Sequence, residues 1–515
     1  MAVVGAVDVL PERVARWASR RRLAPVSLSG IGLACSLSAA AWFSAGVRQA
    51  ELFGAVALVG AYLARRISRE VMWGEQGADA PPRSAAAGLR GAEVAWPQAL
   101  FDRWLARVAS TAGEFTVYAG LAAGAIAAAA HAAAGAGGSG GVARATSTIG
   151  RTATLVSPGW LPGPHSLIGP GALVGSGRLA GTAWIGGGPA STAYQNAWLL
   201  ALGAAVLLAV RQMVRMCKAV AAGRRLDEAE GRPWRMPVIL ADRILGLRAR
   251  ERTVLIAVTA VGWGPQAALI VLTGWGALSA IWAIAARPRP VAGVAPVPDL
   301  AGRLDAGDTA TSNLAGSRDD GAFARFTGRA VRGQLVPFPP AAAGLTATVL
   351  LALLGLRDLS GLLLLAPVAA MLLAAPGSAH PHDGPLDWIV PAILLAGECA
   401  YLIALGAATG VPWPLTFFLA SLVCLRHLDV AVRALAGSPS AVGTALGWEG
   451  RMLGAGFVAM IGFSSFAFIA LSVYIVALLC RNGLGGWLAV REGQPDTQSD
   501  AAYAPAVVAG GVPAR

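Results

Sequence analysis

Long apolar runs recur along the chain, and stretches rich in Arg, Gly or Pro separate them. A helix needs about 20 predominantly apolar residues to cross the roughly 30 Å hydrocarbon core of a bilayer. The first half of the chain contains six runs that predict membrane-spanning helices. They lie at residues 27–47, 52–66, 112–135, 196–216, 252–264 and 266–285.

The second half predicts four or five further spans, so the expected fold is an all-α, polytopic transmembrane helical bundle. Its first two runs are short and are joined by residues 355–358, which fits either two spans or one broken, re-entrant hairpin. An odd total of spans places the two ends of the chain on opposite sides of the membrane. The runs lie at residues 341–356, 361–375, 388–408, 412–432 and 452–480.

Polar stretches between the runs predict the connections. Residues 136–194 are rich in Gly, Ser and Pro and contain too few apolar residues for a core, which predicts a disordered external loop. Residues 288–337 predict a flexible cytoplasmic linker between the halves, and residues 481–515 predict a disordered tail. Residues 98–111 and 234–250 mix Arg with apolar residues, which predicts amphipathic helices along the membrane interface.

Composition supports a membrane protein, since 56% of the residues are hydrophobic and 13% are charged, against about a quarter charged in soluble domains. The net charge of +13 comes almost wholly from Arg, and Lys218 is the one lysine. Basic residues collect in cytoplasmic loops, which explains this charge without a nucleic-acid partner. Arg20 to Arg22 precede the first run and predict a cytoplasmic N-terminus in a bacterial plasma membrane. Tryptophans near the ends of runs, such as Trp388 and Trp448, are expected to anchor at the interface.

Three parts of the first half resemble the CDP-alcohol phosphatidyltransferase family. They are residues 23–46, residues 114–122, and residues 250–252 with Gly264-Pro265, which also predicts a tight turn. The likeness covers residues 10–287. It implies six membrane helices with a metal-dependent site at the cytoplasmic end of the second and third, a role in phospholipid biosynthesis, membrane lipids as partners, and a homodimer.

The catalytic motif of that family is DxxDGxxAR, eight residues, then GxxxDxxxD. Its four carboxylates hold divalent cations on a CDP diphosphate. A register on Ala64-Arg65 retains that pair and Gly74. A register of the second half of the motif on Glu114 and Tyr118 places Ala106 and Ser110 at the last two acid positions, and shifting it by one helical turn recovers Asp102 alone. We therefore expect a degenerate family member, a pseudoenzyme with no cofactor, in which Asp102 and Arg65 are the only catalytic candidates. The acid positions in the first register hold Ala57, Gly60, Ala78 and Pro82.

A partial match to the motif, DGxxAR, begins at Asp320 in the predicted linker. Ser317 holds the first acid position, no membrane helix precedes the match, and residues 336–340 follow where acids should be. We interpret this match as a linker turn.

Beyond residue 310 the chain resembles DUF5941, a membrane domain of unknown function in actinobacteria, and we place this domain at residues 338–480. The likeness rests on residues 339–344, 380–388, 426–429 and 447–451. In that family the domain commonly follows a phosphatidyltransferase-like domain, sometimes with a nucleotidyltransferase before both. The resemblance therefore implies a separate nucleotidyltransferase as a partner.

Charged residues of the second half fall within or against the predicted spans, where charge is costly and points to function. Three interpretations are open: opposite charges that fix helix packing, arginine forks that grip a phosphate headgroup, or proton transfer through His427 and Glu398. No metal site is predicted from these residues. The candidates for substrate or headgroup binding are Asp387, Glu398, Arg426, His427, Asp429, Arg433, Glu449 and Arg451.

These observations give three functional hypotheses. The favoured one is an integral membrane protein that binds a lipid or CDP-linked precursor in envelope assembly, without two-metal catalysis. The second is an active CDP-alcohol phosphotransferase with a non-standard site that uses Mg²⁺ or Mn²⁺. The third is a carrier or flippase for a lipid-linked phosphate.

Overall fold

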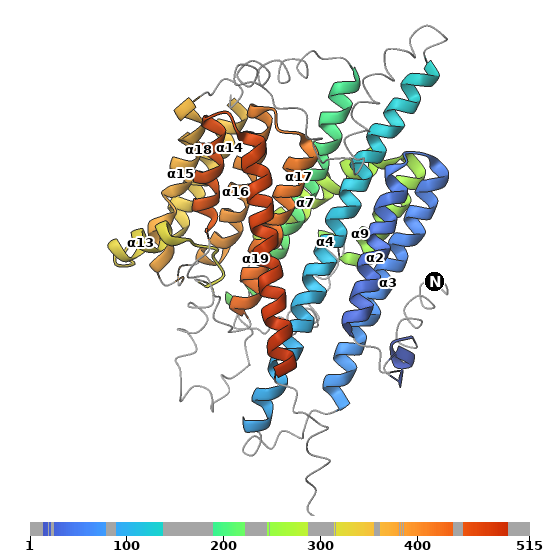
Figure 1. The fold of residues 1–515 in the computed structure, drawn as a ribbon, viewed down its shortest axis with the longest axis horizontal. Helices are drawn as coiled ribbons and strands as arrows, with labels where there is room; N and C mark the ends of the chain where they lie inside the picture. Colours follow the sequence, from blue (N-terminus) through green and yellow to red (C-terminus); the bar gives the residue numbers. More distant parts are fainter. Residues whose placement is uncertain are drawn as a thin grey trace, which may run out of the picture.

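The computed structural model is a bundle of helices, with no strand among the residues that it describes (Figure 1). The all-α prediction is therefore confirmed. The helices of the first half are α2 (Pro25–Ser44), α3 (Arg48–Ala78), α4 (Leu89–Ala136), α7 (Pro189–Ala221), α9 (Ala249–Trp263) and α10 (Pro265–Ala285). The residues described are 14–18, 20–21, 25–78, 89–136, 189–221, 245–246, 248–286, 314, 316–354, 361–380, 382, 384, 386–435 and 446–492.

The second half contains both full-length helices and short helical segments. The short ones are α13 (Ala322–Ala330), η3 (Gly361–Leu365), α15 (Ala366–Leu372), η4 (Ala375–Ala379) and η5 (Asp387–Ile389). The longer ones are α14 (Phe338–Leu354), α16 (Val390–Thr409), α17 (Trp413–Leu435), α18 (Trp448–Met460) and α19 (Ser464–Glu492).

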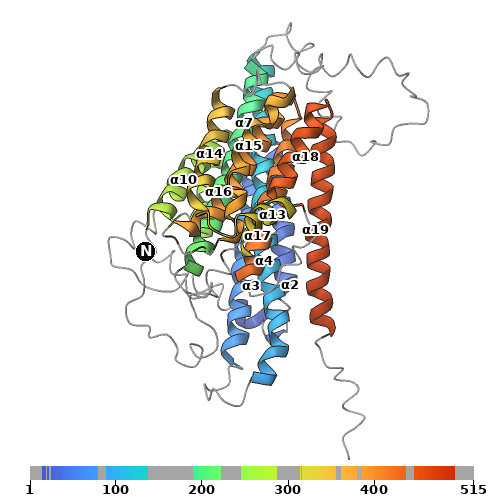
Figure 2. The ribbon, with the colours of Figure 1, turned by 90° about the vertical axis from the view of Figure 1, so that its left-hand side faces the viewer.

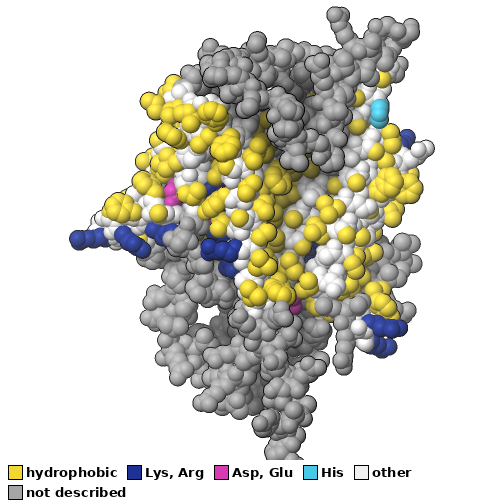
Figure 3. Space-filling view, viewed as in Figure 1, with side chains coloured by type: hydrophobic (Ala, Val, Ile, Leu, Met, Phe, Trp, Pro, Cys, Tyr) yellow, Lys and Arg dark blue, Asp and Glu magenta, His cyan; other side chains and the backbone are white. Residues whose placement is uncertain are grey.

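Eight helical segments are long and apolar enough to cross a membrane, among the residues that are described. Hydrophobic side chains cover the flank of the bundle in Figure 3, while Lys and Arg side chains lie mostly toward its lower margin. These features fit a multi-pass integral membrane protein. The eight segments are Pro25–Ser44, Trp104–Ala134, Thr192–Lys218, Pro265–Ala285, Gly361–Ala379, Asp387–Thr409, Trp413–Ala434 and Ser464–Leu488.

Small residues allow the first helices to approach closely. A Cβ atom on Gly120 would clash with the backbone of Ala40, and one on Gly124 would clash with the carbonyl oxygen of Phe43. Small residues let membrane helices pack backbone to backbone. The predicted tight turn is present, because α9 ends before Gly264, whose φ is +91°, and α10 begins at Pro265.

The two halves share one hydrophobic core. Helix α7 packs against α16 and α17, and α4 packs against α17 and α19 (Figures 1 and 2). The rings of Trp198 on α7 and Phe417 on α17 lie 5.6 Å apart. Buried residues from both halves belong to a single cluster, and α16 and α17 are the most buried spans. The second half therefore packs against the first as part of the same bundle.

The structure differs from the predicted single span at residues 452–480. Helix α18 ends at Met460, and α19 begins at Ser464 and packs back against α18. Gly462, with a φ of +90°, lies in the turn between them. A helix cannot continue through that backbone conformation, but the apolar run continues without a break and hides the turn.

Three other boundaries also differ from the predictions. Residues 98–111 continue directly into the span within α4 instead of forming a separate interfacial helix. Helix α19 extends into the predicted tail as far as Glu492. The predicted linker contains α13 and buried side chains at residues 317–320. Residues 137–188, 222–244 and 493–515, where the loop, the second interfacial helix and the tail were expected, lie outside the described residues.

We expect Gly124→Ala to destabilise the folded protein by about 1–3 kcal/mol, because the added methyl group must push α4 away from α2. Gly30→Ala is the control, since no atom lies within 4 Å of the position of its Cβ. That change should be neutral or stabilising by about 0.5–1 kcal/mol. Thermal unfolding in detergent measures both variants, and equal stability would contradict the packing of α2 on α4.

Candidate functional site

A cluster of buried charges lies where α16, α17 and α18 meet. Arg451 on α18 donates to Glu398 on α16 through Nε at 2.7 Å and Nη2 at 2.8 Å, as a bidentate fork. His427 Nε2 on α17 lies 2.8 Å from Glu398 Oε2, the oxygen that also accepts from Arg451 Nη2. The three residues are fully buried. Glu398 is thereby shared between a guanidinium group and an imidazole.

Asp319, from the segment before α13, pairs with two of the arginines. It accepts from Arg451 Nη1 at 2.5 Å and from Arg426 Nη2 at 3.1 Å. Burial raises the pKa of Asp319, but the guanidinium groups of Arg451 and Arg426 lower it more, so that it lies below its ordinary value. The carboxyl group is therefore ionised at neutral pH and forms true ion pairs.

Asp429 on α17 accepts four hydrogen bonds from three helices. Its Oδ1 atom accepts from Trp104 Nε1 at 2.7 Å and Arg433 Nε at 2.8 Å. Its Oδ2 atom accepts from Arg426 Nη1 and from Asn482 Nδ2, both at 2.8 Å. Trp104 lies on α4 and Asn482 on α19, so this carboxylate ties the first half to the second.

Asp320 forms a neighbouring arm of the cluster. It pairs with Arg318 Nε at 2.8 Å and accepts from Trp448 Nε1 at 2.9 Å. Trp448 is therefore a buried donor and not the interfacial anchor that its position in the sequence predicts. Trp388 is also buried, with the Lys218 ammonium 5.2 Å from its ring centroid.

The acids and arginines of the cluster balance one another. Four carboxylates face four guanidinium groups, and a buried charge is stable only where such pairing compensates for lost hydration. This pairing favours helix packing as the role of the charges over the binding of a headgroup. The buried ion-pair cluster comprises Arg318, Asp319, Asp320, Glu398, Arg426, Asp429, Arg433 and Arg451, with His427 beside them.

Two of the eight predicted site residues lie outside this cluster. Glu449 accepts the backbone N–H of Ala324 at 3.2 Å, and burial raises the pKa of Glu449. Asp387 accepts the backbone N–H of Gly384 at 3.0 Å and lies eleven residues before Glu398, about 16 Å along a helix. The structure brings the other six together.

Sequence reasoning missed Arg318, Asp319 and Asp320, because they fall in a stretch with the composition of a linker. The run of three charged residues directly before Gly321 is the signal that was available. The same segment contains the DGxxAR match, which we interpreted as a linker turn. In the structure its Asp320 is buried and paired.

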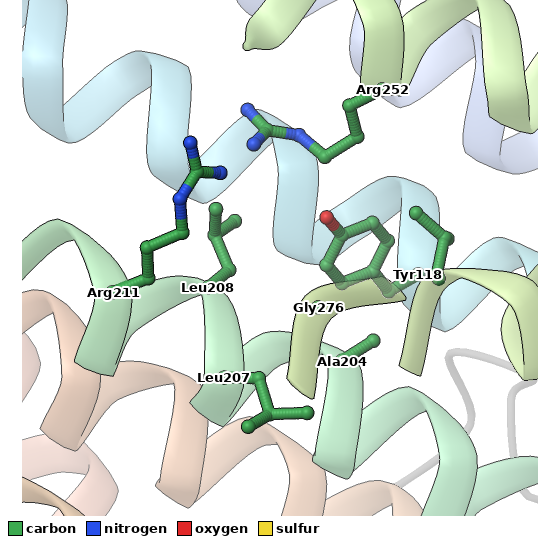
Figure 4. Close-up of a pocket in the computed structure, with 8 residues that line it drawn as sticks. Tyr118, Ala204, Leu207, Leu208, Arg211, Arg252 and Gly276 are labelled. Atoms are coloured by element: carbon green, nitrogen blue, oxygen red, sulfur yellow. The ribbon is translucent and has the colours of Figure 1, made fainter. Parts of the chain in front are cut away.

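A second polar site lies in the first half, between α4, α7, α9 and α10. Arg211 on α7, Arg252 on α9 and Tyr118 on α4 line a small, open pocket. Figure 4 shows the two guanidinium groups extending toward the same space, with the Tyr118 hydroxyl beside them. The described lining contains no carboxylate and is otherwise apolar, with Ala204, Leu207, Leu208, Leu272 and Gly276.

Glu114 holds one of these arginines in place. It lies on α4, one turn before Tyr118, and pairs with Arg252 Nη2 at 2.5 Å. Both side chains of this pair are about nine-tenths buried. The ion pair crosses from α4 to α9 and fixes the Arg252 side chain where α9 begins.

The two catalytic candidates do not meet at this pocket. Arg65 on α3 donates to the backbone oxygen of Ser110 at 3.3 Å. Asp102 lies on α4, twelve residues before Glu114, about 18 Å along the helix axis. Among the described residues, no three Asp, Glu, His or Cys side chains gather in a group that could hold a metal ion.

We expect Asp429→Asn to destabilise the protein by about 3–5 kcal/mol, because Arg426 and Arg433 lose a buried counter-charge. Asp387→Asn is the matched control, since an amide oxygen can still accept the N–H of Gly384, and it should change stability by less than about 1 kcal/mol. Thermal unfolding in detergent tests both. Similar losses for the two variants would refute the importance of the cluster.

Comparison with known proteins identifies the second half alone. Residues 308–502 match DUF5941, a family of unknown function. No curated protein and no solved structure matches the chain. No family match supports the resemblance of residues 10–287 to CDP-alcohol phosphatidyltransferases. The matched region contains every residue of the buried ion-pair cluster, so the cluster lies within a DUF5941 domain that forms the second half of a multi-pass membrane protein.

Proposed function

We propose that the protein binds the phosphate-bearing headgroup of an anionic lipid in the pocket between α4, α7, α9 and α10. The observation that carries this proposal is the convergence of Arg211 and Arg252 from two helices on one otherwise apolar pocket. Guanidinium forks bind phosphate oxygens bidentately, and ionisable groups among membrane helices point to ligand sites.

The rest of the lining suits such a ligand. Tyr118 presents a hydroxyl group that can donate to a phosphate oxygen beside the arginines. Leu207, Leu208 and Leu272 offer apolar contact for the glycerol and first methylene groups of a lipid. The pairing of Glu114 with Arg252 keeps that guanidinium oriented before the ligand arrives.

A CDP-linked lipid carries a diphosphate, whose oxygens can accept hydrogen bonds from the same two arginines. The resemblance of residues 10–287 to CDP-alcohol phosphatidyltransferases is consistent with this ligand class, and binding without catalysis suits a protein of envelope lipid assembly. We place the protein in a bacterial plasma membrane with its N-terminus in the cytoplasm, because Arg20 and Arg21 precede the first span.

We expect Arg211→Gln to weaken the binding of phosphatidic acid, phosphatidylglycerol and CDP-diacylglycerol at least about tenfold, since it removes a charged hydrogen bond. Arg215→Gln is the matched control, because Arg215 lies one turn further along α7 with its side chain exposed. Native mass spectrometry of detergent-purified protein measures lipid binding. Equal losses of lipid binding in both variants would show a general effect of charge and would contradict binding in the pocket.

We expect purified membranes to bind CDP-diacylglycerol without releasing CMP in the presence of Mg²⁺ or Mn²⁺ and a lipid alcohol. Asp102→Ala should leave binding unchanged, because Asp102 lies far along α4 from the pocket. Chromatography of the released nucleotide provides the measurement. If CMP release depends on the metal and disappears in Asp102→Ala, the proposal of binding without catalysis is wrong, and the protein is an active phosphotransferase.

A further inference from the structure

Helix α13 presents three different faces around its axis. With about 100° of rotation per residue, Ala324 and Gly328 share one face, Phe323 and Phe326 a second, and Arg325 and Arg329 a third. The arginine face and the phenylalanine face lie roughly 110° apart. A short helix with this separation can lie flat at a membrane surface, with its aromatic rings toward the acyl chains and its cations toward the headgroups.

The small face of α13 is packed against the protein. Ala324 and Gly328 are buried, and a Cβ atom on Gly328 would clash with Ser378 in η4. The hydroxyl of Ser378 donates to the backbone oxygen of Ala324 at 2.6 Å, and Glu449 accepts the N–H of Ala324. These contacts fix the rotation of α13, so its aromatic and basic faces have defined directions.

The other two faces are exposed. Phe326 has 71% of its surface exposed and Phe323 has 44%. Arg329 is exposed as well, and so is Arg332, two residues after the end of α13, whereas Arg325 is half-buried. In Figure 3 the α13 region forms one lower corner of the bundle, with Lys and Arg side chains along its edge and hydrophobic side chains above them that continue into the flank of the helices.

We propose that α13 is an interfacial anchor. It binds the acidic phospholipid headgroups of the membrane leaflet that lies beside it. Phe323 and Phe326 enter the boundary of the acyl chains, while Arg329 and Arg332 contact lipid phosphates. The bilayer is the occupant that the surface fits, because the aromatic face continues the apolar flank that lipid covers, and the basic face complements anionic headgroups.

This anchor is joined through a short stretch of chain to the buried ion-pair cluster. Only Gly321 separates α13 from Asp319 and Asp320, which pair with Arg451, Arg426 and Arg318. A helix held at the membrane surface therefore holds the segment that supplies two of the four acids. The proposal does not depend on the lipid pocket of the first half, which lies on other helices.

The position of α13 is tested by fluorescence in vesicles. Cys35→Ser and Cys480→Ser leave only the buried cysteines, and a bimane label is placed at Phe326→Cys or, as a control, at exposed Gln334→Cys. In phosphatidylcholine–phosphatidylglycerol vesicles, lipids brominated near the headgroup should quench the label at position 326. Iodide in the buffer should quench the label at 334. Quenching of position 326 by iodide, or by neither quencher, would overturn the proposal in favour of an aqueous surface or a protein partner.

The role of charge is tested in the same assay. Quenching at position 326 by brominated lipid should rise at least about twofold when phosphatidylglycerol is added to phosphatidylcholine vesicles. The pair Arg329→Gln and Arg332→Gln should abolish this rise. The pair Arg215→Gln and Arg481→Gln removes the same charge at exposed positions on other helices and should preserve it. An equal response in both pairs would refute the binding of anionic headgroups by α13.

Discussion

The buried ion-pair cluster shapes the second half of this protein, because a charge among membrane helices is stable only where pairing compensates for lost hydration. Glu398 on α16 is fully buried, and Arg451 of α18 reaches it with two hydrogen bonds. An arginine without such a partner in a low-dielectric interior carries a large desolvation penalty. The turn at Gly462 allows α18 and α19 to pack as separate helices, and the segment before α13 delivers Asp319 to the same place. The turn at Gly462 and the segment before α13 are thus the features that bring opposite charges together.

Buried arginines occur in both halves, but in different settings. In the second half four guanidinium groups pair with four carboxylates in one cluster, and Asp429 accepts hydrogen bonds from three helices. In the first half Arg252 pairs with Glu114, and Arg252 and Arg211 both line a pocket. Our proposals follow from this contrast: the DUF5941 domain stabilises the assembly and contacts the membrane surface, whereas the first half holds the ligand.

Much of the fold could be predicted from hydrophobic patterning, because the spans are long apolar runs and Gly264-Pro265 marks a turn. The charges within the predicted spans also singled out Arg426, Asp429 and Arg433 as site candidates. The partners of these residues could not be predicted, because pairing between residues far apart in the chain leaves no local pattern. Trp104 bonds to Asp429 across 325 positions. The buried charges at residues 318–320 could not be predicted, because the surrounding stretch has the composition of a linker. The end of α18 could not be predicted, because the apolar run continues through it.

The four donors on Asp429 have a consequence for how the chain enters the membrane. Trp104 is synthesised long before its acceptor, and Asn482 arrives after it, near the end of α19. Arg426 and Arg433 lie on the same helix as Asp429, so this helix has more positive than negative charge. Asp319, which is synthesised earlier, supplies a further carboxylate to Arg426. The fourth hydrogen bond of Asp429 can therefore form only after Asn482 of α19 has been synthesised, 53 residues after the carboxylate.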